Sequence, residues 1–151
     1  MQIYLAAPLF SEAERDFNRK VARKLREAGF DVWLPQESLL VKEGTLEEKR
    51  RIYEADIKAL RECDVVVAVL DGVDVDSGVA FEIGYVVALG KPVVGLKTDH
   101  RIFSRVEDIN LILEIPLRAT CKTVSEVIEA LKKFEDVSTR PPLQDALGQK
   151  S

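Results

Sequence analysis

The feature that most constrains the fold is a regular alternation of short apolar runs with longer amphipathic segments. The strongest run, residues 64–70, is Asp-Val-Val-Val-Ala-Val-Leu, and its β-branched side chains suit a central parallel strand buried on both faces. Weaker strands are expected at residues 2–7, 30–34, 93–96 and 117–121. Strands that alternate with helices predict an α/β protein. We expect a flavodoxin-like or Rossmann-like three-layer sandwich with a five-stranded parallel sheet, whose ligands bind beyond the carboxyl ends of the strands.

Capping signals mark the helices that separate these strands. Ser or Thr followed three residues later by Glu, at residues 11–14 and 45–48, predicts helices over about 11–28 and 45–62. Residues 35–44 form an irregular stretch that is long for a connection in an α/β unit, which indicates a functional loop. Further helices are expected at residues 77–89, 106–114 and 123–134.

Composition limits the classes of function. The length of 151 residues fits one domain of ~150 residues, which we place at residues 1–135, followed by a weakly ordered tail at residues 136–151. A net charge of −4 disfavours binding to nucleic acid polymers. No apolar run reaches the ~18 residues that a membrane span needs, and no leader peptide is expected. Two cysteines and one histidine cannot alone form a disulfide framework or a metal site. We therefore expect a cytoplasmic, metal-free enzyme or binding domain.

One carboxylate stands out in the helix expected at residues 77–89. Glu82 is the only charged residue there, and it lies on the flank of an apolar stripe. A bare buried carboxylate costs several kcal/mol, so Glu82 must be paired, hydrogen-bonded or open to a cleft. Near the strand ends such a group is a candidate nucleophile. The alternative is a glutamate that reaches solvent at the end of a helix.

Two aspartates add to this pattern. Asp56 interrupts the apolar stripe of the helix expected at residues 45–62, where the alternative is a solvated aspartate at the stripe's edge. Asp76 directly precedes the helix of Glu82 and can cap that helix or accept a hydrogen bond from a ligand hydroxyl. Its neighbours Asp71 and Asp74 favour turn chemistry over a metal site. A carboxylate pair suggests glycosyl transfer or hydrolysis by a retaining mechanism, which needs a separation of ~5 Å.

Two aromatic residues flank the end of the first expected strand. Tyr4 is expected in the core with its hydroxyl hydrogen-bonded. Phe10 follows in the loop, where it is exposed unless it packs on a nucleobase or on residues 35–44.

Together these segments resemble the nucleoside 2-deoxyribosyltransferases. Residues 3–10 are Ile-Tyr-Leu-Ala-Ala-Pro-Leu-Phe, residues 76–85 are Asp-Ser-Gly-Val-Ala-Phe-Glu-Ile-Gly-Tyr, and residues 90–92 are Gly-Lys-Pro. Asp56 lies between the first two motifs, and the resemblance extends from about residue 2 to residue 134. The Asp-x-Gly-x-x-x-Glu-x-Gly core is fairly specific for this family.

The resemblance implies a role for each matching residue. The glutamate that matches Glu82 attacks C1′ of a 2′-deoxynucleoside, expels the base and holds the sugar covalently until another base attacks. The aspartate that matches Asp56 exchanges a proton with the base, and the tyrosine that matches Tyr4 orients the nucleophile. The resemblance places Phe10 on the base and makes Gly78 a contact of the substrate. No cofactor is required, and the partners are a deoxynucleoside and a free base.

The resemblance also implies contacts at the 5′ end of the sugar. The aspartate that matches Asp76 binds the 5′-hydroxyl group, and an asparagine that matches Asn110 reaches the site of a neighbouring subunit. A homodimer or higher homo-oligomer with shared active sites is therefore expected. Gln36 is a further candidate for a contact with the base. Unlike some transferases, the chain ends in Gly-Gln-Lys-Ser and lacks an aromatic final residue.

Two alternatives stay open. The related 2′-deoxynucleoside 5′-phosphate N-hydrolases share the tyrosine, aspartate and glutamate but pass the sugar to water, and they carry serine where this chain has Asp76. Asp76 therefore favours free nucleosides, although Ser77 lies next to it. A non-catalytic nucleotide-binding sensor is the third possibility, and the complete set of carboxylates argues against it.

Overall fold

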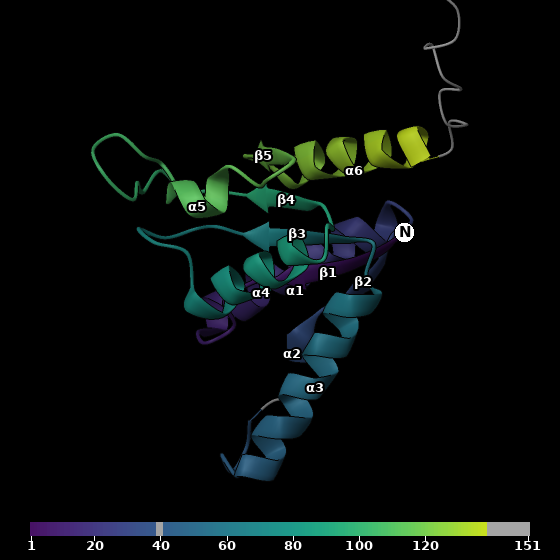
Figure 1. Cartoon of the computed structure of the whole chain (residues 1–151), viewed down its shortest axis with the longest axis vertical. Coiled ribbons are helices and arrows are strands. Elements are labelled where there is room, and N and C mark those ends of the chain that lie inside the picture. Colours follow the sequence, from purple (N-terminus) through teal and green to yellow (C-terminus); the bar gives the residue numbers. More distant parts are fainter. Residues whose placement is uncertain (39–40, 139–151) are drawn as a thin grey trace, which may run out of the picture.

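Five parallel strands form the centre of the molecule, in the order β2-β1-β3-β4-β5. The structure is a computed structural model that describes residues 1–38 and 41–138 (Figure 1). This sheet confirms the expected α/β flavodoxin-like class. The chain moves outward from β1 in opposite directions on its two sides, and ligands in such sheets bind at this switch point. The strands are β1 (Gln2–Ala6), β2 (Asp31–Trp33), β3 (Val65–Val69), β4 (Val93–Leu96) and β5 (Ala119–Cys121).

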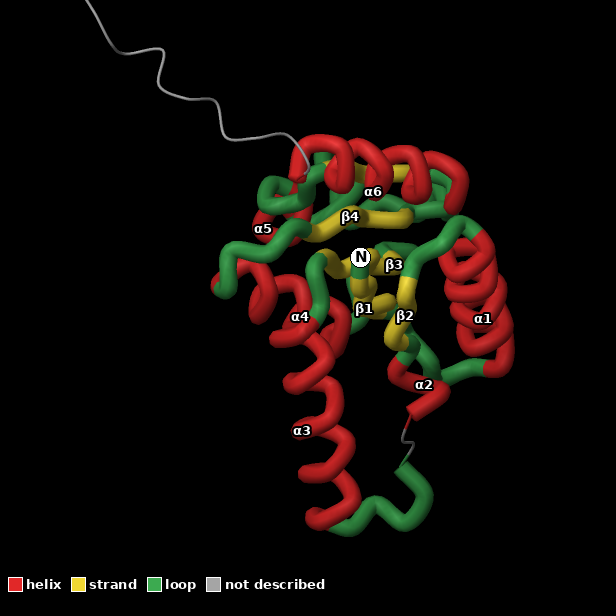
Figure 2. The backbone as a smooth tube through the Cα atoms, turned by 90° about the vertical axis from the view of Figure 1, so that its right-hand side faces the viewer, coloured by secondary structure: helices red, strands yellow, loops and turns green. Residues whose placement is uncertain are grey.

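Helices cover both faces of the sheet, which makes three layers (Figure 2). One face carries α1 (Glu12–Glu27) and α6 (Val124–Ser138). The other face carries α3 (Leu46–Glu62) and α4 (Ser77–Ala88), and the single-turn α5 (Leu111–Glu114) packs against α4. A short α2 (Pro35–Ser38) follows β2. The amino-terminal half of α3 projects well beyond the sheet (Figures 1 and 2).

The core explains why β3 is so apolar. Every residue from Val65 to Leu70 is buried, because the strand lies in the middle of the sheet with helices on both faces. In β1 the faces alternate: Ile3 and Leu5 join the core under α1 and α6, whereas Tyr4 points to the side of α3 and α4. This alternation directs the Tyr4 hydroxyl group toward the helix that follows β3.

The capping predictions hold in part. Ser11 and Glu14 form a complete capping box, with the Ser11 Oγ accepting from the Glu14 amide at 3.1 Å and the Glu14 carboxylate accepting from the Ser11 amide at 2.7 Å. Thr45 caps α3 by accepting from the Glu48 amide at 3.2 Å. The Glu48 carboxylate instead accepts from the amides of residues 42–44, so it holds the preceding turn and forms no reciprocal box.

Several predicted boundaries are wrong. The helix expected at residues 106–114 is confined to Leu111–Glu114, because the Asn110 side chain caps it and starts it there. Residues 35–44 open with the helical turn α2, and the strand expected at 117–121 is paired only from Ala119. Residues 136–138 continue α6, and the rest of the expected tail, residues 139–151, lies outside the described residues.

Candidate active site

A tyrosine and a glutamate form the centre of the site. Tyr4 is fully buried in β1, and its hydroxyl group donates a hydrogen bond to Glu82 Oε1 at 2.5 Å. Glu82 lies in the second turn of α4, which packs against both β1 and β3. The predicted core tyrosine with a satisfied hydroxyl is therefore confirmed. Glu82 is partly buried and hydrogen-bonded, so the alternative of a glutamate that simply reaches solvent is wrong.

The surroundings move the pKa of Glu82 into the neutral range. The pKa of Glu82 is raised to about 7 because burial disfavours its charged form; the Tyr4 hydrogen bond opposes this shift, and the charges of Asp56 and Asp76 add to it. Burial, and then the negative charge of Glu82, raises the pKa of Tyr4, so its phenol stays protonated and donates. The site therefore holds a carboxyl group that can change protonation state at physiological pH.

Asp56 approaches the same point from α3. It is partly buried, and burial raises the pKa of its carboxyl group, whereas a hydrogen bond from the Trp33 side chain lowers it. Its charge acts on both Tyr4 and Glu82. Three elements, β1, α3 and α4, thus bring together the residues predicted to be catalytic. Asp56 is not the freely solvated aspartate of the alternative interpretation.

Asp76 is the cap of α4. Its Oδ2 accepts from the amides of Gly78 at 2.9 Å and Val79 at 3.2 Å, as the capping interpretation predicts. A Cβ atom at Gly78 would lie 3.1 Å from that oxygen, so glycine leaves room for the cap. Because the charge of Asp76 also raises the pKa of Glu82, the cap lies close to the proposed nucleophile.

The other predicted binding residues have contacts or exposure of their own. Phe10 exposes 75% of its surface, so packing on residues 35–38 does not cover it. Asn110 caps α5 and lines a small hollow with the loop that precedes Asp76. Gln36 is part of an internal network, since its amide accepts from Asn18 at 2.9 Å and donates to the Arg15 carbonyl at 2.9 Å. The predicted contact of Gln36 with a base therefore competes with two hydrogen bonds inside the protein.

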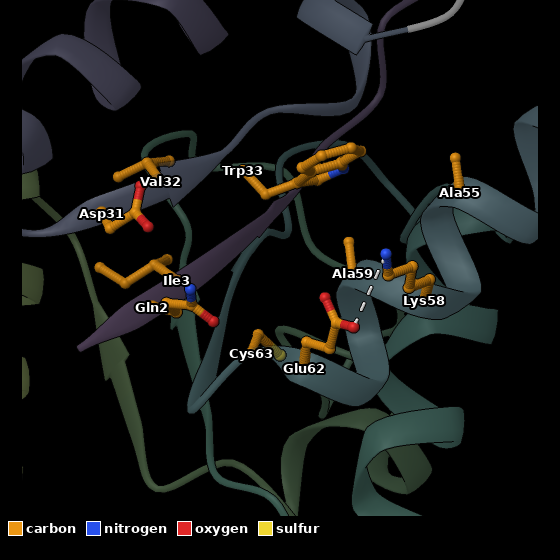
Figure 3. Close-up of a pocket in the computed structure, with 10 residues that line it drawn as sticks. All are labelled: Gln2, Ile3, Asp31, Val32, Trp33, Ala55, Lys58, Ala59, Glu62 and Cys63. Atoms are coloured by element: carbon orange, nitrogen blue, oxygen red, sulfur yellow. Dashed lines mark ion pairs between the residues drawn. The ribbon is translucent and has the colours of Figure 1, made fainter.

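Trp33 is a site residue that the sequence analysis missed. It pairs with Tyr4 in the register of β1 and β2, and its side chain hydrogen-bonds Asp56. It also lines a cavity of about 360 Å³ between β2 and α3 (Figure 3). Neither Asp56 nor Glu82 lines this cavity. Trp33 is the only tryptophan in the chain and ends a strand, which is the one sequence signal that could have marked it.

The described residues give no sign of a metal centre or of a membrane span. They contain no group of three or more His, Cys, Asp or Glu side chains placed to hold a metal ion. Over the same residues, no helix combines the length and apolar character needed to cross a membrane. Both cysteines, Cys63 and Cys121, are free and buried.

The raised pKa of Glu82 predicts a cost in stability. The pKa of Glu82 is about 7 in the folded protein and 4.5 ordinarily. The stability that the protonated Glu82 side chain gives the folded protein is therefore fully present below pH 4.5 and is lost as the pH rises through about 7. Glu82→Gln, which cannot ionise, should raise the free energy of unfolding at pH 8 by up to ~3 kcal/mol, with no gain near pH 4. Urea unfolding at both pH values measures this difference. An equal effect at the two pH values would contradict the assigned shift.

A tyrosine-bound carboxyl group and a second carboxyl group therefore lie at the switch point of a flavodoxin-like sheet. Comparison with known families gives the class of protein. The model of the family Nucleoside 2-deoxyribosyltransferase matches residues 3–135, so the chain belongs to that family.

Individual relatives include both transferases and hydrolases. A Thermofilum pendens protein that carries the name of a 2′-deoxynucleoside 5′-phosphate N-hydrolase is 33% identical over 141 residues, covering 91% of this chain and 94% of the relative. The structure of the 2-deoxyribosyltransferase from Bacillus psychrosaccharolyticus is 29% identical with a TM-score of 0.75, covering 85% of this chain and 90% of the other. The 2-deoxyribosyltransferase of Leishmania mexicana, at 21% identity, a TM-score of 0.67 and coverage of 89% and 97%, shares the fold.

Proposed function

We propose that the protein is a nucleoside 2-deoxyribosyltransferase that works through a covalent deoxyribosyl–Glu82 intermediate. The observation that carries this proposal is the 2.5 Å hydrogen bond from Tyr4 to Glu82, with Asp56 close enough for its charge to act on both. The bond fixes one carboxylate oxygen and leaves the other, Oε2, to react. A nucleophile held in one orientation lowers the entropic cost of attack.

In the first step, a Glu82 oxygen forms a bond to C1′ of the deoxynucleoside, and the bond from C1′ to the base nitrogen breaks. The electron pair goes to the departing base, which takes a proton from Asp56. This step needs Glu82 ionised and Asp56 protonated. Burial raises the pKa of Asp56 above its ordinary value, which favours the protonated form that the departing base requires.

In the second step, an acceptor base attacks C1′ on the face that the first base left. The bond from C1′ to Glu82 breaks, and Asp56 takes a proton from the arriving base, so configuration is retained and both carboxyl groups return to their starting forms. Attack by water in place of a base gives the N-hydrolase. That second candidate is favoured by the name of the Thermofilum pendens relative at 33% identity.

Asp76 supports a free nucleoside as substrate rather than a 5′-monophosphate. The amides at the start of α4 would suit a phosphate group, but the Asp76 carboxylate already accepts from two of them. A second anion at this point would also be repelled by that carboxylate. We assign Asp76 and Gly78 to the 5′ end of the sugar and Phe10 to the base.

Asp76→Ser should relax the discrimination against the phosphate. The serine hydroxyl can still cap α4, while the negative charge is lost. We expect the ratio of kcat/KM for a deoxynucleoside to that for its 5′-monophosphate to fall by about tenfold, the worth of one charged contact. Steady-state assays with both substrates measure this ratio. An unchanged ratio would mean that Asp76 does not discriminate at the 5′ end of the sugar.

Transfer and hydrolysis are separated by a product analysis. The protein is incubated with deoxyinosine, with and without free adenine, and in parallel with deoxyinosine 5′-monophosphate. Deoxyadenosine that forms only when adenine is present supports the transferase. Deoxyribose 5-phosphate released from the monophosphate alone identifies the hydrolase, and no turnover of any substrate identifies a sensor.

We also propose that two copies of the chain associate through α4. This helix is apolar on both sides: Val79, Ile83 and Val86 are buried in the chain's own core, whereas Phe81 and Val87 are exposed. A helix that is apolar all round is normally buried on all sides. Pairing here would also bring the neighbour's Asn110, whose α5 packs on α4, toward this site.

Phe81→Glu should separate the copies. Phe81 is 52% exposed, so a charge is tolerated in a folded single chain but not in an apolar interface. Analytical ultracentrifugation should show an oligomer for the unmodified protein and a lower mass for the variant. Lys20→Glu, on α1 at the opposite face, is the matched control and should keep the oligomer. A monomeric unmodified protein would contradict the proposal.

A further inference from the structure

A buried ammonium group lies at the end of β4, outside the site described above. Lys97 directly follows β4 and is only 2% exposed. Its Nζ lies 2.7 Å from Asp99 Oδ1, 3.2 Å from the Gly72 carbonyl oxygen and 3.5 Å from the Leu70 carbonyl oxygen. Three acceptors thus satisfy the three donors of the ammonium group. Two of the three belong to the segment that leaves β3, so the lysine ties two strand ends together.

Two aspartates complete this connection. Asp99 accepts from the Gly72 amide at 2.8 Å, and Asp71 accepts from the Thr98 amide at 2.5 Å and the Thr98 hydroxyl at 2.6 Å. Burial of Asp99 works against ionisation, but the hydrogen bonds from Lys97, Gly72 and Arg101 prevail and lower its pKa to about 2. We call Asp71, Lys97 and Asp99 the β3–β4 clamp.

The clamp fixes a loop that contains a backbone conformation only glycine adopts readily. Gly72 has a φ of +124°, and a Cβ atom there would lie 2.8 Å from the Asp74 carbonyl oxygen, so only glycine fits this turn. Four residues later the same loop ends at Asp76, which caps α4. The distance between clamp and cap along the chain is therefore short, and the loop has few ways to relax independently of either end.

We propose that the β3–β4 clamp positions Asp76 and thereby sets the specificity for the 5′ end of the substrate's sugar. This inference rests on the proposed function, because it assigns the contact with the 5′ end to Asp76. Lys97 acts through the loop and is a positioning residue, with no contact to the substrate.

The chemistry of the clamp favours positioning over simple stabilisation. A buried ion pair recovers little more than the cost of removing its charges from water, so well-packed apolar side chains would stabilise the fold as well. Directional bonds from one ammonium group to Asp99 and to two loop carbonyls, by contrast, allow only one loop conformation. Apolar packing would not specify this geometry.

The first test is Lys97→Met, which keeps an unbranched apolar stem and removes the ammonium group. We expect KM for a deoxynucleoside to rise about tenfold while kcat changes less than about threefold, because a ground-state contact is lost and Glu82 stays held by Tyr4. The preference for the nucleoside over its 5′-monophosphate should fall toward that of Asp76→Ser. Lys97→Arg should restore part of the KM and part of the preference for the nucleoside. Asp74→Asn, an exposed carboxylate in the same loop, is the matched control and should leave them unchanged.

Hydrogen exchange supplies a readout that does not depend on activity. In Lys97→Met the amides of residues 72–79 should exchange at least about tenfold faster, with the amides of β1 and α1 unchanged. If Lys97→Met does not fold, Thr98→Val removes one bond of the clamp from an exposed position and should show the same effect in smaller measure. Faster exchange confined to residues 97–101, or a fall in kcat without a rise in KM, would overturn the inference. If the unmodified protein has no deoxynucleoside activity but Lys97→Met still exchanges faster at residues 72–79, the proposed function is refuted, whereas the role of the clamp in holding this loop is supported.

Discussion

Glu82→Ala is expected to lower kcat/KM for deoxynucleoside cleavage by at least ~10³-fold, because it removes the proposed nucleophile. Truncation also leaves the buried Tyr4 hydroxyl group without its acceptor. Steady-state release of the free base measures the loss.

Glu82→Gln separates chemistry from packing. Glutamine keeps the volume and can accept the Tyr4 hydrogen bond, but its amide does not form the covalent ester. The loss of activity should therefore match that of the alanine variant, while stability at pH 8 rises. Glu62→Gln, an exposed glutamate on α3, serves as the control and should retain full activity. Turnover by Glu82→Gln within tenfold of the unmodified protein would contradict the assignment of Glu82 as the nucleophile.

Asp56→Asn is expected to lower kcat by ~10² to 10⁴-fold, the usual worth of a general acid. The departing base can then no longer take a proton from residue 56, whereas Glu82 and Tyr4 stay in place. The size of the loss should depend on the base. A base that is stable as an anion needs little protonation, so its deoxynucleoside should be affected least.

The control for Asp56 lies two residues away on the same helix. Glu54→Gln removes an exposed carboxylate of α3 and should leave kcat unchanged. An equal loss in Asp56→Asn for good and poor leaving bases would mean that Asp56 supports the structure of the site and does not transfer the proton.

The sequence indicated the architecture because each central element has a local cause. The β-branched run at Val65–Val69 is apolar throughout since both of its faces are covered, and Ser11 with Glu14 starts α1 through a complete capping box. Glu82 and Asp56 could be singled out because a carboxylate on an apolar stripe needs a partner. They are brought together because α3 and α4 pack against each other and against β1.

Other features depend on contacts between distant segments and left no local signal. In the sequence, Lys97 does not differ from an ordinary surface lysine. Its burial depends on the loop after β3, which supplies two carbonyl acceptors. Trp33 reaches Asp56 only because β2 pairs with β1. The helix around residues 106–114 was predicted too long because the Asn110 cap, rather than the apolar pattern, decides where α5 begins.

The most direct test of the central claim is mass spectrometry of the protein quenched in acid during turnover of a 2′-deoxynucleoside without acceptor base. We expect a fraction of the protein to gain the mass of one deoxyribosyl group, and peptide mapping to place it on Glu82. Addition of free adenine before quenching should discharge the adduct as deoxyadenosine, and Glu82→Gln should never acquire it. Turnover with no adduct, or an adduct on another residue, would contradict the covalent role of Glu82.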